Sequence, residues 1–143
     1  MSLTPGHSES KPYTFDAAGI AAFAAMAGDM NALHHDPATA AQTRFGGLIA
    51  SGAHMTAVLM GFGASMVTRD HQSVGLEFAF RFERAIPADT ATTLTWTVVA
   101  AEPHAKLGGT LLTIDGAIIG PDGKRHVHAT GKAVIWDKPA QSG

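Results

Sequence analysis

The stretch that decides the fold is SGAHMTAVLMGFGASMVTR, residues 51–69. Its large side chains recur on nearly every side of a helix, and the positions between them are mostly Ala, Gly, Ser and Thr. The large residues are Met55, Val58, Leu59, Phe62, Met66 and Val67. A helix that is apolar all round belongs in the interior of a protein rather than on its surface. We therefore expect a long buried helix that the rest of the chain has to wrap.

The sequence after this helix predicts strands. From Val74 to Glu83, apolar residues alternate with polar or small ones, the pattern of a strand with one buried face. Three more strand patterns follow, at 92–101, 108–119 and 124–136, and Gly120-Pro121-Asp122-Gly123 is typical of a hairpin turn. We expect an antiparallel meander of four strands, curled around the helix, and hence an α+β fold.

The first fifty residues predict two short helices on either side of a polar loop. Asp16 is suited to cap the start of a helix that ends near Gly28. Asp36-Pro37 is suited to open a second helix that reaches about Thr43, because proline fits the first helical position.

Length and composition favour one domain. The chain has 143 residues, of which 45% are hydrophobic and 15% charged, so it can bury a substantial core. Its two ends are rich in Ser, Pro, Gly and Lys. We expect a flexible N-terminal arm over residues 1–12, one domain over residues 13–136 and a flexible tail over residues 137–143.

Charge and residue usage exclude several classes of protein. Ten Lys and Arg against twelve Asp and Glu leave a net charge of −2, so there is no basic excess to hold nucleic acid. The absence of cysteine excludes disulfides, thiolate zinc sites and cysteine nucleophiles. No signal-peptide pattern and no apolar run long enough to span a bilayer is found. We expect a soluble cytoplasmic protein that binds neither nucleic acid nor membrane.

The densest group of polar residues is the loop GDMNALHHD, residues 28–36. Asp29 and His34 lie five residues apart in a loop that can fold back on itself, and a carboxylate and an imidazole that face one water form a minimal acid–base pair. Asn31 is suited to bond its own backbone and so to hold the loop. Taken alone, these residue types suit a turn followed by helix caps equally well.

Ser51 and Gly52 form a second candidate site, at the start of the long helix. Unpaired backbone N–H groups and the helix dipole converge there, and a glycine lets a ligand carbonyl approach the main chain. Such donors stabilise a developing enolate or oxyanion by about 3–4 kcal/mol each in measured cases. Phe45, Gly47 and His54 are further candidates for the lining of a pocket, although His54 suits a purely structural role as well.

Read together, these motifs resemble the MaoC-like dehydratases, a family that includes the (R)-specific enoyl-CoA hydratases. The resemblance extends from about Tyr13 to Trp136. It is carried by AGDMNALHHDP at 27–37, AA at 40–41 and TRFGGLIASG at 43–52, and more weakly by FRF at 80–82 and PADT at 87–90.

The resemblance implies a hot-dog fold, in which an antiparallel sheet wraps a long central helix. It assigns Asp29 and His34 to the catalytic pair that binds the water, Gly52 to the amide that polarises the thioester carbonyl, and Asn31 to support of the loop. The implied reaction is the reversible hydration of a trans-2-enoyl-CoA to a 3-hydroxyacyl-CoA. Coenzyme A would arrive as part of the substrate, no metal or redox cofactor would be needed, and the protein would form at least a homodimer.

Two positions depart from the family pattern, and three other hypotheses stay open. Ser51 stands where the family often has His, and Ala32 where it has Pro. The chain could be a non-catalytic hot-dog subunit that binds acyl thioesters. A hot-dog acyl-CoA thioesterase is less favoured, because these enzymes commonly carry an acidic residue in the central helix and residues 53–69 contain none. A metal site at His34-His35-Asp36 is disfavoured, because adjacent residues rarely direct both side chains at one ion.

Overall fold

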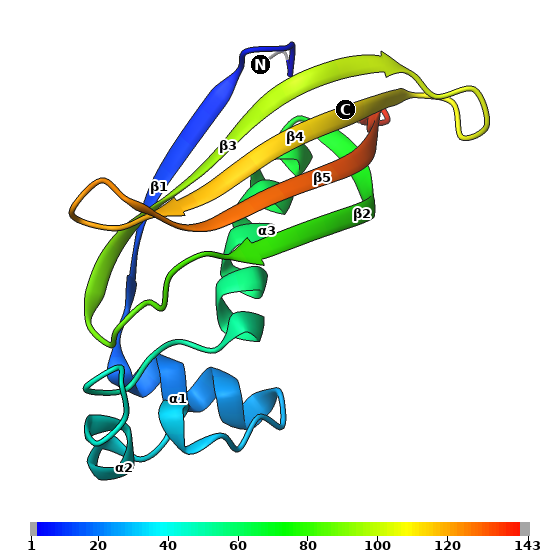
Figure 1. Ribbon diagram of the computed structural model, residues 1–143. Helices are drawn as coiled ribbons and strands as arrows, with labels where there is room; N and C mark the ends of the chain where they lie inside the picture. The colour runs from blue at the N-terminus through cyan, green and yellow to red at the C-terminus, as the bar shows by residue number, and fades with distance from the viewer. Residues whose placement is uncertain (1–2, 141–143) are drawn as a thin grey trace.

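A curled five-stranded antiparallel sheet forms one layer of the molecule, in a computed structural model that describes residues 3–140 (Figure 1). The strand order across the sheet is β1-β3-β4-β5-β2. The strands are β1 (Ser8–Phe15), β2 (His71–Phe82), β3 (Thr90–Pro103), β4 (Thr110–Ile119) and β5 (Arg125–Asp137). The two outer strands, β1 and β2, are therefore the edges of the sheet.

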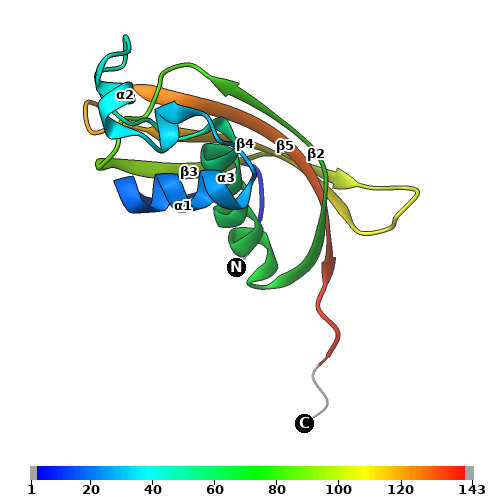
Figure 2. The ribbon, with the colours of Figure 1, turned by 90° about the horizontal axis from the view of Figure 1, so that it is seen from below.

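One long helix, α3 (Gly52–Thr68), lies against the concave face of this sheet (Figures 1 and 2). The shorter helices α1 (Ala17–Met26) and α2 (Pro37–Ala41), with the 3-10 turn η1 (Ala32–His34) between them, gather near the N-terminal end of α3. An antiparallel sheet curled around one long helix is the hot-dog fold, so the predicted α+β architecture is confirmed.

Each of the three α-helices begins where the sequence predicts, because a side-chain oxygen accepts a hydrogen bond from a free backbone N–H of the first turn. Asp16 Oδ1 accepts from Gly19 N at 2.6 Å, Asp36 Oδ1 accepts from Thr39 N at 3.1 Å, and Ser51 Oγ accepts from His54 N at 3.1 Å. Gly28, which follows α1, adopts a φ of +77° that a side chain would strain, and there the chain turns into the polar loop.

Trp96 of β3 joins the sheet to the helix in the centre of the core. Its side chain is fully buried, and its Nε1 donates a hydrogen bond of 2.8 Å to the carbonyl of Leu59 on α3. The indole covers Gly116, its direct partner on β4, where a Cβ would lie 2.6 Å from the ring. Because the glycine leaves room for the ring, the sheet and α3 approach closely at this point.

The expectation that α3 is buried on all sides is wrong. Met55, Leu59 and Met66 are buried against the sheet, whereas Ala53, Ala57, Met60 and Gly61 are exposed. A single sheet can cover only one side of a helix. The opposite side of α3, which is made mostly of small residues, stays open in one copy of the chain.

The predicted buried face of β2 forms only in part, at Phe78 and Phe80, which are half-buried against the core. Val74, Leu76 and Phe82 are about half exposed, because β2 pairs only with β5 and is an edge of the sheet. An irregularity in the pairing between Gly75 and Glu77 interrupts the alternation that the sequence suggests. Only β3, β4 and β5 form a meander, and β2 pairs with β5 rather than with β3.

The structure also corrects the expectation of a flexible N-terminal arm over residues 1–12. Ser8–Phe15 form strand β1, which pairs with β3 from Ser8 opposite Thr97 to Phe15 opposite Thr90. Its polar composition suits an edge strand that faces solvent, and Phe15 anchors its end in the core. Residues 1–2, and residues 141–143 of the expected tail, lie outside the described part of the chain.

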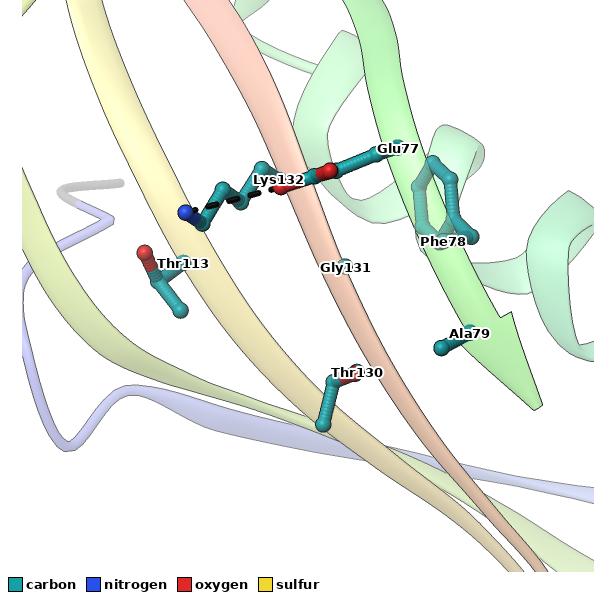
Figure 3. Close-up of a pocket in the computed structure, with 7 residues that line it drawn as sticks. All are labelled: Glu77, Phe78, Ala79, Thr113, Thr130, Gly131 and Lys132. Carbon is teal, nitrogen blue, oxygen red and sulfur yellow. Dashed lines mark ion pairs between the residues drawn. The ribbon is translucent and has the colours of Figure 1, made fainter. Parts of the chain in front are cut away.

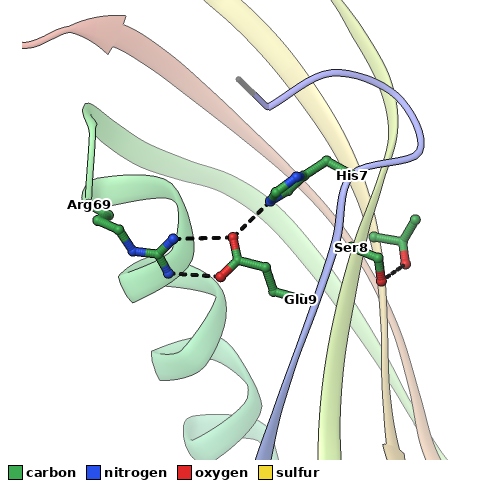
Figure 4. Close-up of polar contacts among 5 residues, drawn as sticks. His7, Ser8, Glu9 and Arg69 are labelled. Carbon is green, nitrogen blue, oxygen red and sulfur yellow. Dashed lines mark hydrogen bonds and ion pairs between the residues drawn. The ribbon is translucent and has the colours of Figure 1, made fainter. Parts of the chain in front are cut away.

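A charged cluster fastens β1 to the C-terminal end of α3 (Figure 4). Arg69 donates two hydrogen bonds to the Glu9 carboxylate, at 2.8 and 3.4 Å, and His7 contacts the same carboxylate at 2.8 Å. These hydrogen bonds, first from Arg69 and then from His7, hold the pKa of Glu9 below its usual value.

Candidate active site

The loop between α1 and α2 brings together the two residues that the sequence singles out for acid–base chemistry. His34 Nε2 and Asp29 Oδ2 lie 3.4 Å apart. The imidazole is buried, with 5% of the residue exposed, whereas the Asp29 side chain is 38% exposed. The pair therefore has a fixed side in the protein and an open side from which a small molecule can approach.

His34 is oriented by the backbone that precedes α3. Its Nδ1 lies 2.8 Å from the carbonyl oxygen of Ile49, and the N–H of Ile49 donates in return to the carbonyl of Leu33. A carbonyl oxygen can only accept, so Nδ1 carries the proton of this hydrogen bond. In the neutral imidazole, Nε2 then presents its lone pair toward Asp29.

Asp29 is held by a set of short-range hydrogen bonds. Its N–H donates to the carbonyl of Ala24 at 2.8 Å, and its Oδ1 accepts from the N–H of Asn31 at 3.1 Å. His35 Nε2 donates to the Asp29 carbonyl at 2.7 Å. Asn31 Oδ1 in turn accepts from Leu33 N at 3.0 Å, so Asn31 does bond its own backbone, as the sequence predicts. Hydrogen bonds within the loop therefore position the carboxylate.

The N-terminus of α3 follows this arrangement directly along the chain. Ile49 holds His34, Ala50 N donates to the carbonyl of Ile86, and Ser51 caps the helix whose first residue is Gly52. The first N–H groups of a helix have no intrahelical acceptor, so they can donate to a ligand. A Cβ at position 52 would lie 3.3 Å from ring atoms of Phe82, which places that aromatic ring beside the helix start.

The three further pocket candidates differ in their placement. His54 is buried among aromatic rings. Phe45 is 40% exposed, and the guanidinium of Arg44 lies 5.5 Å from the centre of its ring. A Cβ at Gly47 would meet no atom within 4 Å, so this glycine borders open space. The hydrogen bonds, ion pairs and ring contacts of the described residues do not join Phe45 or Gly47 to the Asp29–His34 pair.

Sequence reasoning misses two residues of this site. Ile49 orients His34 through its carbonyl oxygen, which every residue type possesses, so no side-chain pattern could have revealed it. Phe82 is the last of the alternating apolar residues of β2 and was expected in the core. Its place beside Gly52 depends on how the end of β2 passes the helix, which the alternation alone does not indicate.

Several hollows lie elsewhere on the described residues, and two of them border Phe78 of β2. One of about 250 Å³ lies on the face of the sheet that points away from α3, where Lys132 of β5 contacts Glu77 of β2 at 3.5 Å (Figure 3). The other, of about 130 Å³, is mostly apolar and lies between α3 and β2, beside Met60 and Gly63. Neither is lined by Asp29 or His34.

The described residues define no metal centre and no membrane span. Within residues 3–140, no three side chains of His, Cys, Asp or Glu gather where they could hold an ion. His34 and His35 each direct one ring nitrogen at a different backbone carbonyl. None of the helices in the same range is long and apolar enough to cross a bilayer.

The fold and the loop that carries Asp29 and His34 correspond to a known family. Residues 4–111 match the family described as "MaoC like domain", so the chain belongs to this family. It is similar to the structure of an (R)-hydratase from A. caviae involved in PHA biosynthesis, with 26% identity and a TM-score of 0.82 over 94% of this chain and 98% of that one. Family membership and this likeness support a hydratase or dehydratase.

Two further solved structures show the same architecture. A MaoC-like dehydratase from Rhodospirillum rubrum is 25% identical, with a TM-score of 0.79 over 96% of each chain. A chain of the HadBC (3R-hydroxyacyl-ACP dehydratase) complex from Mycobacterium tuberculosis is 12% identical, with a TM-score of 0.77 over 95% of this chain and 98% of that one, and this likeness shows the fold alone. No curated protein sequence matches the chain significantly.

Proposed function

We propose that the protein catalyses the reversible hydration of a trans-2-enoyl-CoA to a 3-hydroxyacyl-CoA, with Asp29 and His34 as the catalytic residues. The observation that carries the proposal is the approach of His34 Nε2 to Asp29 Oδ2, at 3.4 Å. The Nδ1 proton of His34 is donated to the carbonyl oxygen of Ile49. When His34 is neutral, Nε2 and the carboxylate are two neighbouring acceptors, and a water on the open side of the pair can donate one O–H to each.

This arrangement suits general acid–base catalysis of the addition of water. The pair takes one proton from the water while its oxygen bonds to C3 of the enoyl group. The π electrons of the C2=C3 bond shift toward the thioester carbonyl, which becomes enolate-like. A proton from the pair then bonds to C2, so that the net change is the addition of H and OH across one double bond. No metal or redox cofactor takes part in these steps.

The N-terminus of α3 supplies the electrostatic part of the proposal. The Gly52 N–H would donate to the thioester oxygen as negative charge develops on it, and the helix dipole adds to this effect. Ser51 keeps the first turn in place by capping the helix. Phe82 stands beside Gly52, so an apolar ring borders the approach to this donor.

The surface of one copy supports the proposal that the active form is a homodimer or a larger homo-oligomer. β2 presents Val74, Leu76 and Phe82 on an open sheet edge, and the free side of α3 carries Ala53, Ala57 and Gly61. Pairing of two copies along β2 would cover the edge and leave the acyl group near the interface. We place the reaction in acyl-CoA metabolism of the fatty-acid type, in the cytoplasm, which suits a chain without cysteine.

The proposal is tested by the loss of enoyl-thioester absorbance with purified wild-type protein, on crotonyl-CoA and on a series of longer enoyl-CoAs. We expect turnover on at least one of them and formation of the 3-hydroxyacyl-CoA. Release of free coenzyme A without hydration would indicate a thioesterase. A folded, oligomeric protein that binds enoyl-CoA and leaves it unchanged would indicate a non-catalytic subunit, and the hydratase proposal would then be wrong.

A further inference from the structure

His54 is a buried polar residue that the proposed chemistry does not use. It lies in the first turns of α3, and only 3% of the residue is exposed. Its Nε2 shares a hydrogen bond of 3.3 Å with the hydroxyl of Tyr13. Its Nδ1 is buried and has no hydrogen-bond partner within the described residues. A buried polar atom without a partner costs free energy on folding, so the Nδ1 of His54 does not itself stabilise the fold.

The imidazole of His54 lies where three elements of the fold meet. It stacks face to face on Phe23 of α1, with the ring centres 4.7 Å apart and the planes 7° from parallel. Phe15 of β1 meets it edge-on at 5.0 Å, and Tyr13 of the same strand meets it at 6.3 Å. The Tyr13 hydrogen bond fixes the rotation of the ring. A flat, oriented ring is what a face-to-face contact with Phe23 requires, and a branched aliphatic side chain cannot supply one.

The stacked pair is connected to both halves of the candidate active site. Phe23 immediately precedes Ala24, whose carbonyl accepts the hydrogen bond from the N–H of Asp29. The backbone N–H of His54 donates to the side-chain Oγ of Ser51, which caps the helix that begins with Gly52. His54 therefore links the end of α1 that holds Asp29 to the start of α3.

We propose that His54 is a positioning residue for hydration, which acts through Phe23 and Ala24 to set the distance between the Asp29 carboxylate and the N-terminus of α3. This inference rests on the proposed function for its catalytic consequence. Its structural part, the fixing of Asp29 by the His54–Phe23 stack, stands without it. Burial lowers the pKa of His54, while the charge of Asp16 opposes this shift, so the ring that stacks at neutral pH is the uncharged one.

The test compares His54→Leu, which removes the flat ring, with His54→Phe, which keeps it. In His54→Leu we expect kcat to fall about tenfold with KM changed less than about threefold, because the reacting groups are displaced while the substrate surface is kept. In His54→Phe we expect kcat within about threefold of wild type. Val67→Ala is the matched control, since Val67 is a buried α3 residue at the far end of the helix. It should lower Tm while kcat is unchanged.

Hydrogen exchange at the Asp29 amide separates a failure of this inference from a failure of the proposed function. We expect the protection of that amide to fall about tenfold in His54→Leu, and to stay at the wild-type value in His54→Phe and Val67→Ala. This readout holds even if no enoyl-CoA is turned over. If His54→Leu does not fold, Phe23→Leu, which removes the other ring of the stack, must show the same loss of protection. Unchanged Asp29 protection in the folded variant, or an equal loss in Val67→Ala, would overturn the inference.

Discussion

Gly63 of α3 lies so close to the indole of Trp96 that a Cβ at this position would sit 2.8 Å from Nε1, the atom that donates to Leu59. Two residues further back in the same helix, Gly61 borders open space within 4 Å. The two glycines share a helix and differ only in what they face. Substitutions at the two positions therefore separate the intrinsic cost of a glycine in a helix from the room that a glycine leaves for a packed neighbour.

The first prediction follows from this pair of glycines. Gly63→Ala pushes the indole away and weakens its hydrogen bond to Leu59, so it destabilises the fold by about 1–3 kcal/mol. Gly61→Ala meets no obstacle and gains helix propensity, so its effect is zero to about 1 kcal/mol of stabilisation. Urea unfolding of the two variants beside wild type measures both. Equal effects of the two substitutions would show that the close approach of Trp96 does not constrain position 63.

The second prediction concerns the carboxylate that ties β1 to α3. The hydrogen bonds from Arg69 and His7 lower the pKa of Glu9, so the stability they add is present above the ordinary value of 4.5 and is lost as the pH falls below it. Glu9→Gln should therefore lower stability at pH 7 by about 1 kcal/mol or less and leave it nearly unchanged near pH 3. The control is Glu77→Gln, which alters the exposed pair with Lys132 and should shift Tm little at either pH. A Glu9→Gln effect that persists at pH 3 would exclude this cause.

The third prediction is that the fold loses stability at acidic pH because of the protonation of His54. Burial lowers the pKa of His54 below its ordinary value of 6.5, and its neighbours from β1 and α1 are the aromatic rings of Tyr13, Phe15 and Phe23. As the pH falls through 6.5, the unfolded chain binds a proton that the folded chain accepts only at lower pH, so stability falls. Asp16, whose charge favours the protonated ring, reduces this loss without reversing it.

Thermal unfolding at pH 7.5 and at pH 5 measures this effect. Wild type should lose more Tm between the two pH values than His54→Phe, which has no titrating group at this position. The other histidines contribute to both proteins and cancel in the comparison. Parallel curves for the two proteins would contradict a destabilising protonation of His54.

The fourth prediction concerns the start of α3. In Gly52→Ala the new methyl group lies 3.3 Å from the Phe82 ring, which is half exposed and can give way, so Tm should change little. The methyl group and the displaced ring crowd the N–H that the proposed thioester oxygen approaches, so kcat should fall by about tenfold or more. Val67→Ala, at the other end of the same helix, is the control and should keep wild-type kcat. A Gly52→Ala protein with full activity would remove this amide from the mechanism.

Much of the fold can be predicted from the sequence, and the errors share one physical origin. Local signals predicted well: the caps at Asp16, Asp36 and Ser51 and the strand patterns after the long helix all correspond to elements of the structure. The apolar pattern of α3 and β2 was read as burial within one chain, yet parts of both are open. A sequence records which surfaces avoid water, and it does not record whether the same chain or another one covers them.

The candidate site, too, could be predicted from the sequence only in part. Asp29 and His34 could be singled out because a carboxylate and an imidazole in one loop are chemically conspicuous, and the structure brings them together. The Ile49 carbonyl and the ring of Phe82 could not, because a backbone oxygen carries no sequence signal and the position of Phe82 depends on packing between distant segments. Strand β1 was not predicted because its composition is polar, and an edge strand that faces solvent resembles a loop in sequence.

The most direct test of the central claim is the rate of crotonyl-CoA hydration by wild type, Asp29→Asn and His34→Ala, measured on folded protein of the same oligomeric state. If the two side chains act together on one water, each variant loses about a hundredfold or more in kcat, and the double variant loses little beyond the worse single one. Retention of most of the wild-type rate by either variant would contradict the assignment of Asp29 and His34 as the catalytic pair.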